Sequence, residues 1–326
     1  MMRGSSGEGT AGARTLHRRS TWLAFVFLTA ATCTSASAQT DLAGSWMSIQ
    51  HEDALERGNG PYQVDYAGLP LNEEGRARAL SYSASQYSML ERQCAFWPPH
   101  YIVMGPWGLR IWPQLDPVDG RTAAWVIGPF EDRGTTTIWM DDRPHPSEHA
   151  RHPQGGFTTG KWEGNTLVTR TTHMKAGAIR RNGAPSSDQE VMTMRLIRHG
   201  DLLTVLVITE DPIYLTEPYM LSKSFRLSVD GPPLLPTGPP CSPAFEGTDA
   251  GGSVPHILPG RNTETDELMR LYHIPVEAAL GGAATMYPEY RKKLKDAFVR
   301  PERCPANCGA GQPPAAAAAP APTPRR

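Results

Sequence analysis

Histidine and aspartate side chains concentrate in one segment near the middle of the 326-residue chain. His145, His149 and His152 fall within eight residues, and the acidic pair Asp141–Asp142 comes just before them. Imidazole and carboxylate groups are ligands of zinc and other divalent ions, and they also act as general acids and bases. The segment therefore predicts either a divalent-metal site built on the three histidines or a metal-free acid/base site.

A fourth histidine, His173, comes from the next strand-like run. Side chains alternate along a strand, which predicts that His173 faces a barrel interior together with the threonines before it. A histidine in that position could act as a general base near neutral pH. The acid/base hypothesis thus pairs His145 or His152 with His173, and Asp141 or Asp142 supplies the carboxylate.

A purely structural interpretation of these histidines stays open, in which they cap backbone groups in a solvated polar loop. Pro144 and Pro146 flank His145 and keep this part of the loop extended. The extended conformation excludes the helical His-Glu-x-x-His zinc motif of metalloproteases. The chain also lacks the motifs of serine hydrolases, nucleotide-binding proteins and c-type haem proteins. The cofactor is therefore left open, and a divalent metal is the one that these residue types allow.

Aromatic and basic side chains supply candidates for ligand binding. Several tryptophans lie in or beside strand-like runs, and the candidates for a ligand site are Trp112, Trp125, Trp139 and Trp162. They could line an apolar cavity, or they could be ordinary core residues. Arg180 and Arg181 precede an Asn-Gly turn, where they either bind a carboxylate or form a solvated face.

The elements that must position these side chains are mainly β-strands. Short runs rich in β-branched and aromatic residues, separated by proline and glycine, predict about ten strands. They cover residues 45–49, 101–104, 109–112, 123–127, 135–140, 157–162, 166–173, 191–198, 202–209 and 219–227. This spacing is typical of an antiparallel barrel or sandwich. The tripeptide Gly44-Ser45-Trp46 is lipocalin-like, since lipocalins close one barrel end with such a tryptophan.

Helices are expected before and after the strands. Asn72 is a suitable N-cap for a helix over residues 73–83, with glutamates in its first turn. Three short C-terminal helices are predicted after the Pro/Gly-rich connection 230–259, over residues 263–272, 275–281 and 287–298. We expect the C-terminal helices to pack across the barrel mouth or its outer wall.

Both ends of the chain differ in composition from the middle. Residues 1–38 have the basic start, the apolar run and the small-residue cleavage site of a signal peptide. Residues 39–300 form the predicted single β-rich domain, and the Pro/Ala-rich residues 301–326 form a predicted disordered tail. The mature protein is therefore expected in the periplasm or secreted, with no transmembrane segment. The net charge of −1 argues against nucleic acid and leaves a small molecule as the expected partner.

Four cysteines remain after removal of the signal peptide: Cys94, Cys241, Cys304 and Cys308. An even number of cysteines in an exported chain favours disulfide bonds. Three pairings are open, and we favour Cys94–Cys241 with Cys304–Cys308.

A series of ordered motifs spans most of the mature chain. They are LPLNEEGRARA (69–79), ERQC (91–94), IWMDDRPHP (138–146), GKWEGNTLV (160–168), IRRNG (179–183), DPIYLTEP (211–218) and TMYPEYRKK (285–293). Together they resemble a family of exported bacterial proteins found in acidobacterial and proteobacterial genomes, a family with no assigned activity. The resemblance implies export and a shared fold, and it transfers no catalytic residue.

Two functional hypotheses follow. The first is an exported, barrel-like protein that binds a small, partly apolar ligand. The alternative is a periplasmic hydrolase, lyase or isomerase that uses the His/Asp site, with or without a divalent metal. A third, weaker hypothesis is an interaction module of the cell envelope, for which only the Pro/Ala tail argues.

Overall fold

A computed structural model describes residues 40–49, 62–89, 94, 98–104, 108–129, 134–231 and 254–294. All of the described residues belong to one unit of the chain, Thr40–Arg326. The predicted signal peptide and the predicted Pro/Ala tail lie outside them.

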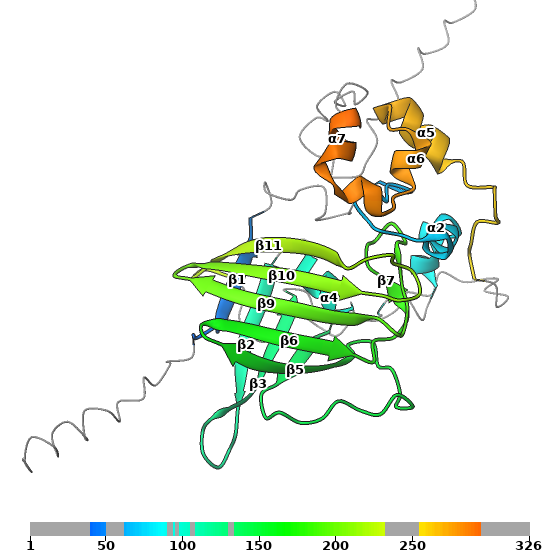
Figure 1. Ribbon diagram of the computed structural model, residues 1–326. Helices are drawn as coiled ribbons and strands as arrows, with labels where there is room; N and C mark the ends of the chain where they lie inside the picture. Colours follow the sequence, from blue (N-terminus) through cyan, green and yellow to red (C-terminus); the bar gives the residue numbers. More distant parts are fainter. Residues whose placement is uncertain are drawn as a thin grey trace, which may run out of the picture. The chain divides into compact units, whose positions relative to one another are not determined.

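Nine strands close into a barrel, in the order β1-β11-β10-β9-β6-β5-β4-β3-β2 (Figure 1). The strands are β1 (Gly44–Ser48), β2 (Gly108–Leu115), β3 (Thr122–Pro129), β4 (Thr136–Trp139), β5 (Phe157–Glu163), β6 (Thr166–Thr172), β9 (Val191–His199), β10 (Leu202–Glu210) and β11 (Tyr219–Leu227). The mainly β prediction is confirmed, and the barrel rather than the sandwich is formed.

One neighbouring pair departs from the expected antiparallel pattern. β4 and β5 run parallel, with Ile138 paired to Thr158 and Trp139 paired to Thr159. The long histidine-containing loop joins these two strands. A parallel pair needs a crossover connection, because a tight hairpin joins only antiparallel strands. The length of this loop is therefore what permits the parallel pairing.

One predicted strand is wrong. Residues 101–104 belong to a short buried helix, α4 (Pro99–Met104), in which the Pro98 carbonyl accepts hydrogen bonds from the Tyr101 and Ile102 amides. Proline suits the first position of a helix, since its missing N–H would have had no helical partner. A short apolar run has no periodicity to separate helix from strand. The other nine predicted strands are present.

The barrel core is built from the inward residues of each strand together with α4. Trp46 of the Gly-x-Trp tripeptide is 0% exposed, and its Nε1 donates to the Leu42 carbonyl at 3.0 Å. The Arg198 guanidinium lies 5.2 Å from the Trp46 ring centre. Trp46 thus fills one part of the interior, and the half-buried Arg198 lies over its ring.

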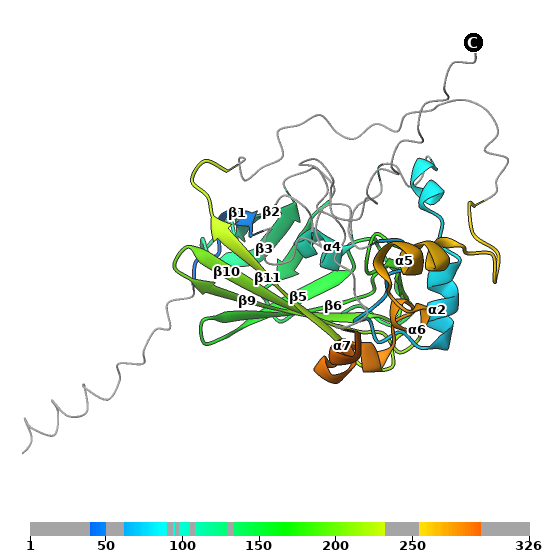
Figure 2. The same cartoon turned by 90° about the horizontal axis from the view of Figure 1, so that it is seen from above.

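Short helices gather around the end of the barrel where the two-stranded sheet of β7 (Gly177–Ala178) and β8 (Pro185–Ser186) lies (Figures 1 and 2). They are α2 (Glu73–Leu80), η2 (Ala84–Ser88), α5 (Glu264–Tyr272), α6 (Val276–Ala279), η3 (Ala283–Met286) and α7 (Pro288–Leu294). The predicted cap of α2 is confirmed, because Asn72 Oδ1 accepts from the Gly75 amide at 2.8 Å. A second apolar cluster lies under these elements.

The IRRNG segment fastens this second cluster. Asn182 is fully buried, and its Nδ2 donates to the Tyr62 and Asp65 carbonyls. Gly183 has φ +87°, and a Cβ there would lie 2.1 Å from the Tyr82 ring. Only glycine satisfies both the positive φ and the close approach. The Asn-Gly pair is therefore structural.

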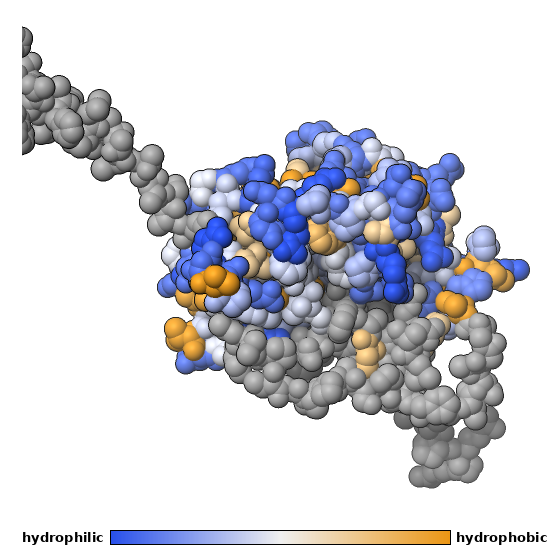
Figure 3. Space-filling model, turned by 90° about the horizontal axis from the view of Figure 1, so that it is seen from below, coloured by the Kyte–Doolittle hydropathy of each residue, from blue (hydrophilic) through white to orange (hydrophobic). Residues whose placement is uncertain are grey.

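The described surface is mixed in character. In Figure 3, hydrophilic residues cover most of the visible face and hydrophobic ones form small separate patches. Scattered apolar residues of this kind are normal on a folded protein. Within the described ranges, no helix combines the length and the apolar character that crossing a membrane requires.

Candidate functional site

A row of directly paired residues crosses seven strands of the barrel on its inner face. The row is Trp125, Ile138, Thr158, Thr171, Met192, Thr209 and Tyr219. Trp125, Ile138 and Met192 belong to the barrel core, so the paired residues face inward with them. The row carries hydroxyl groups into an interior that is mainly apolar but also contains the buried Thr169 and Lys223. The Thr158 and Thr171 hydroxyls bond to each other at 2.8 Å.

Two carboxyl groups extend this inner face beyond the strand ends. Glu190 lies two residues before Met192, and Asp211 lies two residues after Thr209. The inner faces of β9 and β10 are adjacent, because Met192 pairs with Thr209. Both carboxyl groups therefore lie at the barrel end next to β8.

Glu190 is the more perturbed of the two. It is 1% exposed, and neither carboxyl oxygen has a hydrogen-bond partner of normal geometry. Burial, and then the negative charge of Asp211, raise the pKa of Glu190 to about 8, while the nearby Ser186 hydroxyl opposes the shift. Glu190 is therefore mostly protonated and uncharged at neutral pH.

Asp211 has the opposite environment. Its Oδ2 accepts from the Ser187 amide at 2.6 Å, and its Oδ1 accepts from the Ser187 hydroxyl at 2.8 Å. The Ile213 and Tyr214 amides also donate to Oδ1. These four donors satisfy both oxygens of the Asp211 carboxyl group. One carboxyl group thus lacks hydrogen-bond partners of normal geometry, and its neighbour has several.

His100 of α4 is a third buried polar group at this end. It is 1% exposed, and neither ring nitrogen has a hydrogen-bond partner of normal geometry. Burial lowers the pKa of His100 to about 4, although the Ala178 backbone opposes the shift. Ala178 pairs with Pro185 in the small sheet, next to Ser186. His100 and Glu190 therefore lie against the same two-stranded sheet, and both are uncharged at neutral pH.

Arg180 approaches the same end from the IRRNG segment. Its Nη2 donates to the Tyr219 hydroxyl at 2.8 Å, and its guanidinium carbon lies 5.4 Å from the Tyr219 ring centre. Tyr219 pairs with Thr209, so Arg180 borders the polar row. The second candidate arginine, Arg181, is half-buried in the turn. Ligand binding by either arginine stays a prediction.

The histidine loop lies elsewhere, on the outer face of β5 and β6. His145 Nε2 is 2.8 Å from the Thr159 hydroxyl, and His145 Nδ1 is 2.7 Å from the Thr172 hydroxyl. The same Thr172 hydroxyl is 2.7 Å from His173 Nδ1, and the His152 and His173 ring centres are 5.1 Å apart. The predicted meeting of the loop histidines with His173 is therefore present in the structure.

The predicted direction of His173 is wrong, however. β6 ends at Thr172, and His173 adopts a positive φ of 58°, which breaks the alternation. His173 Nε2 instead donates to the Ser147 carbonyl at 2.9 Å. His173 thus belongs to the outer loop and does not follow Thr171 into the barrel.

The four hydrogen bonds that link Ser147, His173, Thr172, His145 and Thr159 form a hydrogen-bond chain. They have one consistent set of donors and acceptors when both imidazoles are neutral. The Ser147 carbonyl only accepts, so His173 Nε2 carries the proton and Nδ1 accepts from the Thr172 hydroxyl. Thr172 then accepts from His145 Nδ1, and Thr159 donates to His145 Nε2. Partial burial, and then the positive charge of Arg170, lower the pKa of His145, which favours its neutral form. The hydrogen-bond chain therefore holds the histidine loop against the outer face of the barrel.

Replacing Thr172 by valine should loosen this loop. The change removes the acceptor of His145 and the donor to His173, so we expect a loss of about 1–3 kcal/mol in the free energy of unfolding. Thr193→Val is the matched control, since Thr193 pairs with the outward Arg170 on the neighbouring strand. Urea unfolding of both variants checks this. If Thr172→Val were as stable as wild type, the proposed hydrogen-bond chain would be contradicted.

The carboxylates expected to serve these histidines have other positions. Asp141 forms an exposed ion pair with Arg143, which lowers the pKa of Asp141. Asp142 is exposed and has φ +53°. Neither is hydrogen-bonded to a histidine in the described contacts. The histidines of the predicted acid/base site are therefore together, but neither of its predicted carboxylates contacts them.

The metal prediction on His145, His149 and His152 is also not supported. His149 lies in solvent, 3.7 Å from Glu148, while His145 contacts the two threonines. No three His, Cys, Asp or Glu residues in the described part of the chain form a group that could hold a metal ion. Residue types suited to a metal are present, but the extended loop spreads them apart.

The four candidate tryptophans divide between the two faces of the barrel. Trp125 belongs to the core and Trp162 packs against it, and the Nε1 atoms of both are buried without a partner. Trp139 lies on the outer face, where the guanidinium carbon of Arg143 is 3.7 Å from the centre of the Trp139 ring. Trp112 alternates with the core residue Ile111 and lies against Gly128. The prediction of one cavity lined by all four is therefore wrong, because Trp125 and Trp162 face inward whereas Trp112 and Trp139 face outward.

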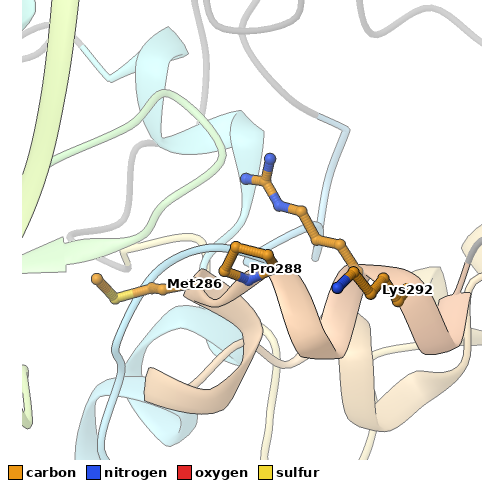
Figure 4. Close-up of a pocket in the computed structure, with 4 residues that line it drawn as sticks. Met286, Pro288 and Lys292 are labelled. Carbon is orange, nitrogen blue, oxygen red and sulfur yellow. The ribbon is translucent and has the colours of Figure 1, made fainter.

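A shallow surface pocket of about 430 Å³ lies beside α7, lined by Met286, Pro288, Arg291 and Lys292 (Figure 4). In the close-up, Met286 and Lys292 extend away from each other. None of the four side chains is buried. This pocket lacks the convergent polar groups of the barrel end.

Sequence reasoning missed Glu190 and His100. Glu190 has the same parity as Met192, Met194 and Leu196, a signal that the residue faces inward. His100 stands alone in an apolar run, which is also a signal. Neither signal shows that the groups meet.

The predicted disulfides remain predictions, since Cys241, Cys304 and Cys308 lie outside the described residues. No protein-family model matches this chain, and no curated protein matches it.

Proposed function

We propose that this protein binds a small, partly apolar molecule inside its barrel. The supporting observation is a set of buried, inward-facing polar atoms without hydrogen-bond partners, set among apolar core residues. They are Trp125 Nε1, Trp162 Nε1, Thr136 Oγ1 and Thr209 Oγ1. An unsatisfied buried polar group costs about 1–3 kcal/mol, so a bound molecule that completes these bonds is favoured.

The chemistry of the lining defines the expected ligand. The indole N–H groups only donate, and the threonine hydroxyls both donate and accept. The surrounding methionine, leucine and valine side chains favour an apolar body. A molecule with a compact apolar part and at least one carbonyl or hydroxyl oxygen fits this lining.

The same proposal places the mature protein in the periplasm or outside the cell. The signal-like residues 1–38, the even number of remaining cysteines and the resemblance to exported bacterial proteins support it. The intact mass of protein purified from the periplasm should correspond to a chain shortened by about 38 residues. A full-length mass would argue against export.

Prodan, a neutral naphthyl ketone whose emission shifts to the blue in apolar surroundings, tests the binding function. Wild-type protein should give a saturable blue shift. Trp125→Phe and Trp162→Phe should each weaken binding about fivefold, because each removes one donor worth about 1 kcal/mol. The outer-face variants Trp112→Phe and Trp139→Phe are matched controls and should stay within about twofold.

Two outcomes would overturn the proposal. One is the absence of saturable Prodan binding by wild-type protein. The other is an equal effect of the inner and outer tryptophan variants. The enzymatic alternative on His145, His152 and His173 has less support, because Asp141 pairs with Arg143 and not with a histidine.

A further inference from the structure

We propose that Glu190, Thr209 and His100 form a recognition site for an uncharged carboxamide head group at the β8 end of the barrel. The inference rests on the ligand-binding function proposed above, and it names the class of ligand. It concerns residues that lie apart from the histidine loop.

The fold brings Glu190 and Thr209 onto one inward face. Thr209 pairs directly with Met192, and Glu190 precedes Met192 by two residues on the same side of its strand. Diagonal neighbours of this kind are about 7–8 Å apart, within reach of a long side chain. A small polar group between them could contact both.

His100 reaches the same region through the small sheet. Its ring lies next to the Ala178 backbone, and Ala178 pairs with Pro185. Ser186, the next residue, lies near the Glu190 carboxyl. β7 and β8 therefore connect the surroundings of His100 and Glu190.

The unpartnered atoms of the three side chains define what would fit. Neutral Glu190 offers one O–H donor and one carbonyl acceptor, and neutral His100 offers one N–H donor and one nitrogen acceptor. Thr209 adds a hydroxyl that both donates and accepts. A carboxamide carries two N–H donors and one carbonyl oxygen, so it pairs with a protonated carboxyl through two hydrogen bonds at once. Each donor then meets an acceptor without any net charge.

Burial argues against an ionic ligand at this site. The Asp211 carboxylate acts on Glu190 and would repel an anion placed beside them. The Arg180 guanidinium, which borders the row through Tyr219, has the opposite charge, so the two groups together favour neither sign of ligand charge. Asp211 already accepts from the Ser187, Ile213 and Tyr214 segment, so its oxygens are not open to a cation. A buried ion would also lose its hydration, whereas an amide loses much less.

Ionisation of Glu190 supplies a pH signature for this site. Asp211 and the Ser186 hydroxyl act on Glu190 directly, and Arg180 borders the same polar row through its bond to Tyr219. Above pH 8 the Glu190 carboxyl loses its proton, its only donor, and becomes a second negative charge beside Asp211. Amide binding should therefore weaken as the pH rises through this value.

Displacement of Prodan by octanamide, octanoate and octyltrimethylammonium tests the proposal on the full mature chain. At pH 7, octanamide should bind at least about tenfold more tightly than either ion. Thr209→Val and Glu190→Leu should each weaken octanamide about fivefold or more. Glu190→Gln keeps a donor and an acceptor, so it should retain the affinity at pH 7 and remove the weakening above pH 8. Glu210→Gln, one residue from Asp211 on the exposed face of β10, should behave as wild type.

The outcomes separate this inference from the proposed function. If Prodan binds but the three competitors are equivalent, or Glu190→Gln shows the wild-type pH profile, the carboxamide site is wrong and the binding function stands. If Prodan itself does not bind, the proposed function fails and the carboxamide site fails with it. Should Glu190→Leu not fold, Thr209→Val and Glu190→Gln still decide the question.

Discussion

Replacing Glu190 by glutamine should raise the stability relative to wild type by on the order of 4 kcal/mol as the pH increases from about 4.5 to about 8. Burial and the nearby Asp211 raise the pKa of Glu190 from its ordinary value of 4.5 to about 8. Between these two values the folded state binds a proton that the unfolded state has released. Folding therefore becomes less favourable as the pH rises.

The sign of this effect follows from linkage. Below pH 4.5 the carboxyl is protonated in both states and imposes no pH-dependent cost. Each pH unit above that value costs the folded wild type about 1.4 kcal/mol, until Glu190 ionises in the folded protein near pH 8. Glutamine does not titrate, so the variant lacks this dependence.

Urea unfolding at several pH values between 4 and 9 provides the measurement. The informative quantity is the difference in unfolding free energy between Glu190→Gln and wild type, because a constant offset from repacking cancels in its pH slope. Glu210→Gln is the control, since its side chain is exposed on the same strand end as Asp211. A difference that stays flat across this range would show that Glu190 titrates normally. A buried acid that destabilises the fold at neutral pH is typical of a functional group rather than a structural one.

Asp211→Ala should destabilise the protein by about 3–5 kcal/mol. The carboxylate accepts hydrogen bonds from the Ser187 amide, the Ser187 hydroxyl and the Ile213 and Tyr214 amides. Alanine removes every one of these acceptors at once. The buried Ser187 donors then have no partner, and the turn after β10 loses its closing bonds.

Asp188→Ala provides a matched control, because Asp188 is an exposed aspartate in the same neighbourhood and should change stability by less than about 0.5 kcal/mol. Asp211→Asn should fall between the two, since its amide keeps one oxygen acceptor and directs an NH₂ group toward existing donors. Thermal and urea unfolding of the three variants test the order. Similar stabilities for Asp211→Ala and Asp188→Ala would show that the Asp211 hydrogen bonds are dispensable.

The strands were predictable because their signal is local. Residues 219–227 alternate between inward and outward side chains, and β11 covers the same residues in the structure. The predicted strand over residues 101–104 failed because four apolar residues without alternation are compatible with either a strand or a helix. The helix α4 begins at the proline that precedes these four residues, so the helical signal lies in the proline and not in the apolar residues.

The histidine loop was predicted in part. The sequence indicated that His145, His152 and His173 would come together, and the structure joins them through Thr172 and a ring contact. It did not indicate the positive φ of His173 or the ion pair that occupies Asp141. Both depend on how the loop packs against the outer face of the barrel.

By itself, the sequence determined the mainly β architecture, the positions of the nine barrel strands, the Asn72 cap and the grouping of the loop histidines. These depend on side-chain alternation, turn residues and short-range hydrogen bonds. Only the tertiary structure decided the protonation states of Glu190 and His100, and which tryptophans face the interior. A pKa shift and an unsatisfied donor depend on the loss of water and on distances between residues far apart in the chain. Closure of the barrel creates both of these conditions.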